Sequence, residues 1–243
     1  MFLFYLEIYN ISLNAMRQII ATSIVLFATS YLFENKYKMF LIWVTVAFTF
    51  HGGSISSMAL LPIYHIVKIK NQKISNQILG GVFVIICFLL IILSLSNIVT
   101  YLVSIGILRP NYLKYIRGGI FTETTGSFSM MVLLIETVYM SAIILHFGKL
   151  KKRNMQSIFY VMVCGLVFFI RLIAPTMAQY LSRASYYFLP IQIIALISIP
   201  QCYNKKSQKI VNLVLIALSL STWIFQFVIK GSHETIPYQF FWS

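Results

Sequence analysis

The sequence contains no aspartate. Among its 243 residues, five glutamates are the only acids, against 19 lysines and arginines, for a net charge of +14. Carboxylate clusters that hold Mg²⁺ or Ca²⁺ are therefore excluded, as are aspartate-based sites for sugar nucleotides. Charged residues make up only 10% of the chain, whereas soluble domains carry about 25%. An ordinary soluble domain is excluded as well.

Further chemistry is missing. The three cysteines, Cys87, Cys164 and Cys202, show no CxxC spacing, so they predict neither a disulfide framework nor a thiolate metal site. The sequence has no HExxH, GxGxxG, P-loop or GxSxG pattern, which leaves metalloprotease, nucleotide and serine-hydrolase chemistry without support. We therefore expect no metal and no cofactor. In so apolar a chain, we expect the positive charge to meet lipid phosphate rather than nucleic acid.

Long apolar runs are what the chain has in abundance. Hydrophobic residues form 59% of the sequence, which suffices for about seven crossings of a bilayer at about 20 residues each. The sequence predicts an all-α, polytopic integral membrane bundle: a single transmembrane domain, 1–243, with about six full spans plus a short broken-helix hairpin near 39–67. The apolar runs lie near 16–34, 39–50, 54–67, 77–98, 127–148, 155–174, 184–200 and 210–229.

Four clusters of basic residues lie in the connections between these runs and hold twelve of the 19 basic residues. The positive-inside rule places all four clusters in the cytoplasm. Only 29 residues separate Lys38 from Lys68, so this stretch must leave and re-enter the same face as two short helices that break near His51. A single broken helix is the alternative. The clusters are Lys36 and Lys38; Lys68, Lys70 and Lys73; Lys149, Lys151, Lys152 and Arg153; and Lys205, Lys206 and Lys209.

The other seven basic residues fall on the outer side, and five of them are arginines. The guanidinium fork binds phosphate in bidentate fashion and stays charged. This asymmetry favours an outer site for an anionic substrate, with Arg17, Arg171, Arg183 and Arg117 as candidate ligands. The alternative is that these side chains extend to lipid phosphates at helix ends. The seven are Arg17, Arg109, Lys114, Arg117, Arg171, Arg183 and Lys230.

Two other residues and one segment are candidates for a functional role. Glu136 lies inside an apolar run, where a carboxylate is either protonated or paired, so an ion pair or a hydrogen bond to a neighbouring helix is the alternative to a catalytic role. His51, at the hairpin break, could donate to phosphate or act as an acid or base, or it could simply cap the break. The outer loop 99–126 is apolar with spaced cations and predicts an interfacial helix.

Short elements in order along the chain resemble the EpsG-like family of bacterial polysaccharide polymerases, relatives of the Wzy-type O-antigen polymerases. Its R-Q-x-x-A element matches Arg17 to Ala21, and its A-x-x-F-H-x-S element is similar to Ala47 to Ser54. Three further matches are Lys114-Tyr115, Arg183 to Phe188, and Ile236-Pro237-Tyr238. Members usually carry further spans before the R-Q element, so the resemblance predicts that the chain is the C-terminal portion of a longer polymerase.

The resemblance implies glycosyl transfer on the outer, periplasmic face of the bacterial inner membrane. A glycan on a polyprenyl diphosphate would be passed to another lipid-linked repeat unit, for O-antigen, capsule or exopolysaccharide synthesis. Arg17, Arg171 and Arg183 would stabilise the departing diphosphate without metal. His51 is the first candidate for the base that accepts the hydroxyl proton, followed by Glu136 or Glu123. The expected partners are the lipid-linked oligosaccharide, membrane lipids and a chain-length regulator protein.

Two other functions fit the composition. A flippase or transporter of lipid-linked oligosaccharide would also need cations and broken helices, but it would present them to both faces. A membrane O-acyltransferase of glycans would need a histidine near the cytoplasmic face, where only His65 and His146 are available, and neither lies in a recognisable motif.

Overall fold

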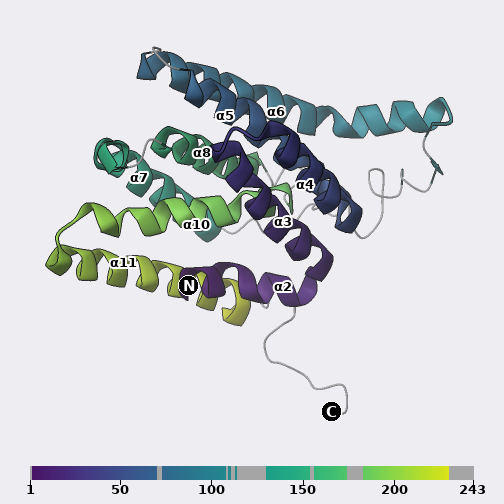
Figure 1. Ribbon diagram of the computed structural model, residues 1–243. Helices are drawn as coiled ribbons and strands as arrows, with labels where there is room; N and C mark the ends of the chain where they lie inside the picture. The colour runs from purple at the N-terminus through teal and green to yellow at the C-terminus, as the bar shows by residue number, and fades with distance from the viewer. Residues whose placement is uncertain are drawn as a thin grey trace, which may run out of the picture.

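The computed structural model describes residues 2–69, 73–107, 109–110, 113, 130–153, 156–173 and 183–229 (Figure 1). These residues are helical almost throughout and contain no strand. Together with the apolar character of the helices, this confirms the prediction of an all-α membrane bundle.

Within the described residues, four helices are long and apolar enough to cross a membrane. They are α3 (Met16–Phe33), α6 (Ile74–Ser104), α7 (Met130–Arg153) and α11 (Lys205–Trp223), the last of which continues as the π-helix η7 (Ile224–Ile229). Each coincides with a predicted span. At 31 residues, α6 is longer than the predicted run 77–98 and includes the first residues of the predicted outer loop 99–126.

Two of the six predicted full spans are shorter than expected. The 17-residue helix α8 (Ser157–Ile173) is one. The other, predicted at 184–200, begins as the 3-10 helix η5 (Arg183–Tyr187), and its α-helix α10 (Leu189–Ser198) starts only where Pro190 occupies the first turn. Proline suits that position because the first turn of a helix needs no N–H partner within the helix. The 3-10 turn η6 (Pro200–Cys202) follows α10.

The segment between Lys38 and Lys68 is a hairpin, as the lysine positions predict. Helix α4 (Tyr37–Phe50) ends at His51, whose backbone is extended, and the chain returns through the 3-10 helix η2 (Gly52–Ala59) and α5 (Leu60–Lys68). The Nζ atom of Lys68 lies 3.5 Å from the hydroxyl of Tyr37, so the end of α5 meets the start of α4. A single broken helix would instead separate these two residues by the full thickness of the bundle.

The hydrophobic core is centred on α8. Its side chains Phe159, Val163 and Leu166 are fully buried, and it packs against α5, α6, α7 and α10. In Figure 1, α6 lies along one edge of the bundle and α11 lies along the opposite edge.

The described lysines gather at one end of this bundle. The turn between α3 and α4 carries Lys36 and meets α5 through a hydrogen bond from the Tyr64 hydroxyl to Asn35 Oδ1 (3.3 Å). The start of α8 lies beside the same turn, since the rings of Phe33 and Phe159 are 5.4 Å apart. The end of α7 reaches the connection between α10 and α11, because Lys149 Nζ lies 4.0 Å from the centre of the Tyr203 ring.

The N-terminal residues form part of the bundle. The predicted spans begin near residue 16, but α1 (Phe2–Phe4) and the π-helix η1 (Tyr5–Tyr9) pack beside α11, as Figure 1 shows, and α2 (Asn10–Asn14) connects them to α3. The apolar side chains of Leu6 and Ile8 account for this packing, since both are almost fully buried there.

We predict that single cysteines introduced at exposed Lys36, Lys68, Lys151 and Lys206, in a chain whose native cysteines are replaced by serine, are labelled by an impermeant maleimide from one common side of the membrane. An Arg17→Cys variant should be labelled only from the other side. The physical reason is that the four lysines lie at one end of the bundle. Labelling of the lysine positions from both sides in sealed vesicles would contradict the hairpin topology.

Candidate functional site

The opposite end of the bundle brings together the start of α3, the short helix η5, and the break between α4 and η2. The side chain of Gln18, in the first turn of α3, donates from Nε2 to the backbone carbonyl of Arg183 (2.9 Å). The hydroxyl of Tyr187, at the other end of the five-residue η5, lies 2.5 Å from Nδ1 of His51. The short helix η5 therefore joins the start of α3 to the break in the hairpin. Three of the segments that resemble the family therefore meet at this point: Arg17 to Ala21, Ala47 to Ser54, and Arg183 to Phe188.

The ring of His51 is held in one tautomer. Its Nδ1 accepts a hydrogen bond from the backbone N–H of Gly53 (3.2 Å), so this nitrogen carries no proton, and the nearby Tyr187 hydroxyl is then a second donor to it. A neutral imidazole with an accepting Nδ1 carries its proton on Nε2. The ring thus offers an N–H donor, rather than a lone pair, to whatever lies beyond Nε2.

The charge of this ring depends on its surroundings. His51 lies in the turn between the apolar helices, and its partial burial lowers its pKa, with the positive charge of Arg183 as a second cause in the same direction. Both causes penalise an added positive charge. The imidazole of His51 is therefore neutral at neutral pH, in agreement with the tautomer that its hydrogen bonds define.

The predicted arginines occupy different environments. Arg183 is half-buried in η5, and its charge acts on His51 and Tyr186. Arg171 is in the last turn of α8, and its charge also acts on Tyr186. Arg17 is exposed at the start of α3, directly before the Gln18 that contacts the Arg183 carbonyl. Three of the four candidate arginines thus lie towards the same end of the bundle.

Glu136 and Arg171 form a buried ion pair. Arg171 Nη1 contacts Glu136 Oε1, and Gln192 of α10 donates from Nε2 to Glu136 Oε2 (2.8 Å). The Glu136 side chain is 1% exposed and that of Arg171 is 14% exposed. Because both carboxylate oxygens have partners, Glu136 links α7, α8 and α10. This is the ion pair that the sequence left open as the alternative to a catalytic role.

The structure adds a second, partly buried acid that the sequence analysis missed. Glu7 of η1 accepts a hydrogen bond from the Tyr139 hydroxyl (2.9 Å), which also lies 2.9 Å from Ser219 Oγ of α11. Glu7 is close enough to Arg171 and Glu136 for their charges to act on it. A signal was present in the sequence, because a lone glutamate in an apolar segment is expected to have a buried partner.

Two buried polar atoms flank the pair formed by His51 and Tyr187. Gln18 Oε1 and Ser54 Oγ have no hydrogen-bond partner within the described parts of the chain, although both side chains are almost completely buried. Buried polar atoms are nearly always satisfied in folded proteins, so atoms of this kind mark positions that require an explanation. Thr22 Oγ1, Trp43 Nε1 and Ser157 Oγ are likewise unpartnered within the described residues, so such atoms do not single out this end of the bundle.

Several predicted residues lie outside the described residues. These are Glu123 and Arg117, the elements Lys114-Tyr115 and Ile236-Pro237-Tyr238, and most of the outer loop 99–126. Their roles stay predictions. Within the described ranges, no group of three or more histidine, cysteine or acidic side chains is arranged to hold a metal ion.

The fold and this site define a polytopic membrane protein that carries lysines at one end and arginines, with a neutral histidine, towards the other. The chain belongs to the EpsG family, because the EpsG family model matches residues 1–240. Membership of this family indicates a polysaccharide polymerase-type role in the membrane. No curated protein and no solved structure shows a significant match to the chain.

We predict that Gly53→Ala separates His51 from Tyr187. An added Cβ atom would lie 3.0 Å from both His51 Nδ1 and the Tyr187 hydroxyl, so at least one ring must move. Gly52→Ala is the matched control, since its Cβ would meet only Phe48 at an ordinary 3.8 Å. In detergent, Gly53→Ala should lower the melting temperature and Gly52→Ala should leave it unchanged. Equal melting temperatures for both variants would show that the close approach at Gly53 is not a constraint.

We predict that Glu136→Ala destabilises the protein by about 3–5 kcal/mol, because it leaves the Arg171 charge buried without a partner. The double variant Glu136→Gln/Arg171→Gln should recover most of this loss, since no charge stays behind. Glu34→Ala is the control: it removes an ion pair with Lys36 in which both side chains are more than half exposed, and such pairs contribute little. The stability of all three variants is measured by unfolding in a detergent titration. A Glu136→Ala variant as stable as the wild type would contradict the buried pair.

Proposed function

We propose that this protein polymerises polyprenyl-diphosphate-linked oligosaccharide repeat units at the arginine end of the bundle. Membership of the family supports this class of reaction, and the positive-inside rule supports an outward-facing location for this end, which we assign to the outer face of the bacterial inner membrane. One observation carries the proposal. The backbone carbonyl of Arg183 in η5 accepts from Gln18, the residue after Arg17, and the hydroxyl of Tyr187 in η5 contacts His51, so two arginines and a neutral imidazole belong to one end of the bundle.

The reaction needs a stabilised leaving group above all. The acceptor hydroxyl oxygen forms a bond to the anomeric carbon of the donor glycan, and the bond from that carbon to the diphosphate oxygen breaks. The electron pair leaves with the diphosphate, and the hydroxyl proton passes to a base. Fixed cations answer the growing negative charge without needing to reorganise. We propose a metal-independent transfer in which Arg183 and Arg17 bind the diphosphate through their guanidinium forks.

Arg171 and Glu136 have another place in this scheme. Their mutual contact and the amide of Gln192 occupy the carboxylate of Glu136, so this pair positions α7, α8 and α10 around the site. The charge of Arg171 acts on Tyr186, between Arg183 and Tyr187, which ties the pair to η5. Arg171 thus contributes to the electrostatic field at the diphosphate while its own geometry is set by Glu136.

His51 is best suited to donate from Nε2. With Nδ1 accepting from Gly53, the proton of the neutral ring is on Nε2, from which it can be donated to an oxygen of the departing diphosphate. The sequence favoured His51 as the base, and that role would require the opposite tautomer. Glu123, the remaining candidate for the base, lies outside the described residues.

The distribution of charge favours a polymerase over a carrier. A flippase must present its binding groups to both faces in turn, whereas the candidate arginines that the structure describes lie towards one end of the bundle. The product class, whether O-antigen, capsule or exopolysaccharide, and the chain-length regulator expected as a partner stay predictions from the resemblance.

We predict that Arg183→Ala and Arg183→Lys both abolish long glycan chains in cells while the amount of membrane protein is unchanged. Loss of a donor that faces developing charge lowers rates by roughly 10²–10³, and lysine cannot replace the bidentate fork. Arg17→Ala and Arg17→Lys should behave alike, and Lys206→Ala, at the other end, should be silent. Chain length is read from extracted polysaccharide on a gel. Full-length polymer from the lysine variants would contradict the bidentate argument, and full-length polymer from the alanine variants would refute the site.

A further inference from the structure

An apolar groove of about 580 Å³ lies between the returning half of the hairpin and α6. Its wall on the hairpin side includes Ile55, Met58 and Pro62, and its wall on α6 includes Phe83, Cys87 and Phe88. Ile55 and Met58 are exposed. The groove is therefore an open, methyl-rich and aromatic channel along the bundle surface, where the surrounding solvent is lipid.

The groove is continuous with the polar site. Ile55 follows Gly53, which donates to His51, by only two residues. On the other wall, the Phe88 ring packs edge-on against Phe188, with centroids 6.1 Å apart, and Phe188 directly follows Tyr187. One end of the groove thus lies beside the pair formed by His51 and Tyr187, and it extends from there along α6 towards the middle of the bundle.

We propose that this groove binds the isoprenoid chain of the polyprenyl-diphosphate substrate while its diphosphate lies against Arg183 and His51. The assignment rests on the proposed function, and charge complementarity selects the occupant: the ligand must combine an anionic head at the arginine end with a long apolar chain. Lipid tails gain no hydrophobic free energy by leaving a bilayer for a protein surface. Selectivity for the isoprenoid therefore comes from the anchored head group and from the packing of its methyl branches against Met58 and Phe88.

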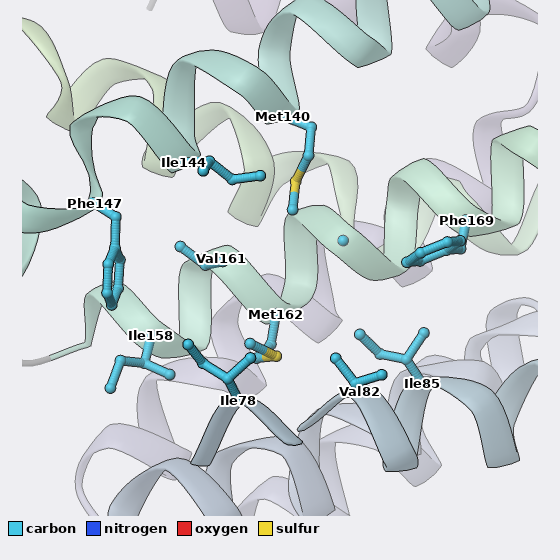
Figure 2. A pocket seen from close by; sticks show the side chains of 11 residues that line it. Ile78, Val82, Ile85, Met140, Ile144, Phe147, Ile158, Val161, Met162 and Phe169 are labelled. Carbon is cyan, nitrogen blue, oxygen red and sulfur yellow. The ribbon is translucent and has the colours of Figure 1, made fainter. Parts of the chain in front are cut away.

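A second apolar groove is a less suitable site for the chain. It has a volume of about 260 Å³ and lies between α6, α7 and α8, as Figure 2 shows. Its lining includes Phe147 of α7 and Ile158 of α8. Both residues lie near the end of the bundle that carries Lys149 and the turn between α3 and α4. The lining also includes Phe169, two residues from Arg171, so this groove spans most of α8, and its volume, less than half that of the first groove, is what makes it the less suitable site.

Photocrosslinking tests the groove directly. Purified wild-type protein in lipid nanodiscs is irradiated with a polyprenyl monophosphate that carries a diazirine in its isoprenoid chain, and the modified residues are located by mass spectrometry. We expect modification within residues 55–62 and 83–91. Unlabelled polyprenyl phosphate should compete, and the same concentration of phosphatidylglycerol should not. Ser56→Trp, which fills the groove from a half-buried position in its lining, should lower the yield there several-fold, whereas Ile144→Trp, in the second groove, should not.

A different pattern of crosslinking overturns the proposal. Modification confined to the second groove would assign the chain to that site, and equal competition by phosphatidylglycerol would show that the groove holds bulk lipid. The experiment needs no turnover, so it is independent of the proposed reaction. If the groove is modified as expected but Arg183→Ala still makes full-length polymer, the groove assignment stands and the proposed arginine site fails. If Arg183→Ala abolishes polymer and the groove is unmodified, the function stands and the groove assignment fails.

Discussion

The pairing of Glu136 with Arg171 is the interaction on which the site depends. A charge inside an apolar bundle is expensive unless an opposite charge and hydrogen bonds accompany it, and removal of one partner is costlier still. Gln192 completes the arrangement, so α7, α8 and α10 are held together where η5 leads into α10. The other elements of the site are arranged around this fixed point: the hairpin break through Tyr187, and the start of α3 through Arg183.

The same cost of charge explains why the rest of the sequence is so strongly divided. Most cations lie in the connections, where water and lipid phosphate can reach them, and lysine dominates at one end. Within the described helices, Glu7, Glu136 and Arg171 belong to one electrostatic network. Through Arg171 this network acts on Tyr186 of η5, the neighbour of the Tyr187 that contacts His51. The cations proposed to bind substrate are thus different residues from the lysines that set the topology.

Features that follow from counting residues along the chain could be predicted from the sequence. Features that depend on side-chain contacts between distant residues could not. The hairpin was predictable because 29 residues between Lys38 and Lys68 cannot make two full crossings. A partner for Glu136 was predictable as well, but its identity was not, since Arg171 and Gln192 are brought to it by helix packing. The pair of His51 and Tyr187 joins residues 136 positions apart, and no local pattern encodes it. Glu7 was missed because its segment was not among the predicted spans. Pro190 was a signal that the span at 184–200 begins late.

The winding of η2 has a consequence for the surface that it presents. In a 3-10 helix, every third residue returns to the same face, whereas three residues carry an α-helix only about 300° round its axis. Ser54 and Ser57 are accordingly both fully buried, and Ile55 and Met58, three apart, are both exposed towards α6. The three-residue repeat of η2 therefore keeps the two serines on the buried face and the two apolar side chains on the face towards α6. Were η2 to rewind as an α-helix, each later side chain would shift by about 20° more than the one before it, and the row of small hydroxyls would turn out of register with the row of apolar side chains behind it.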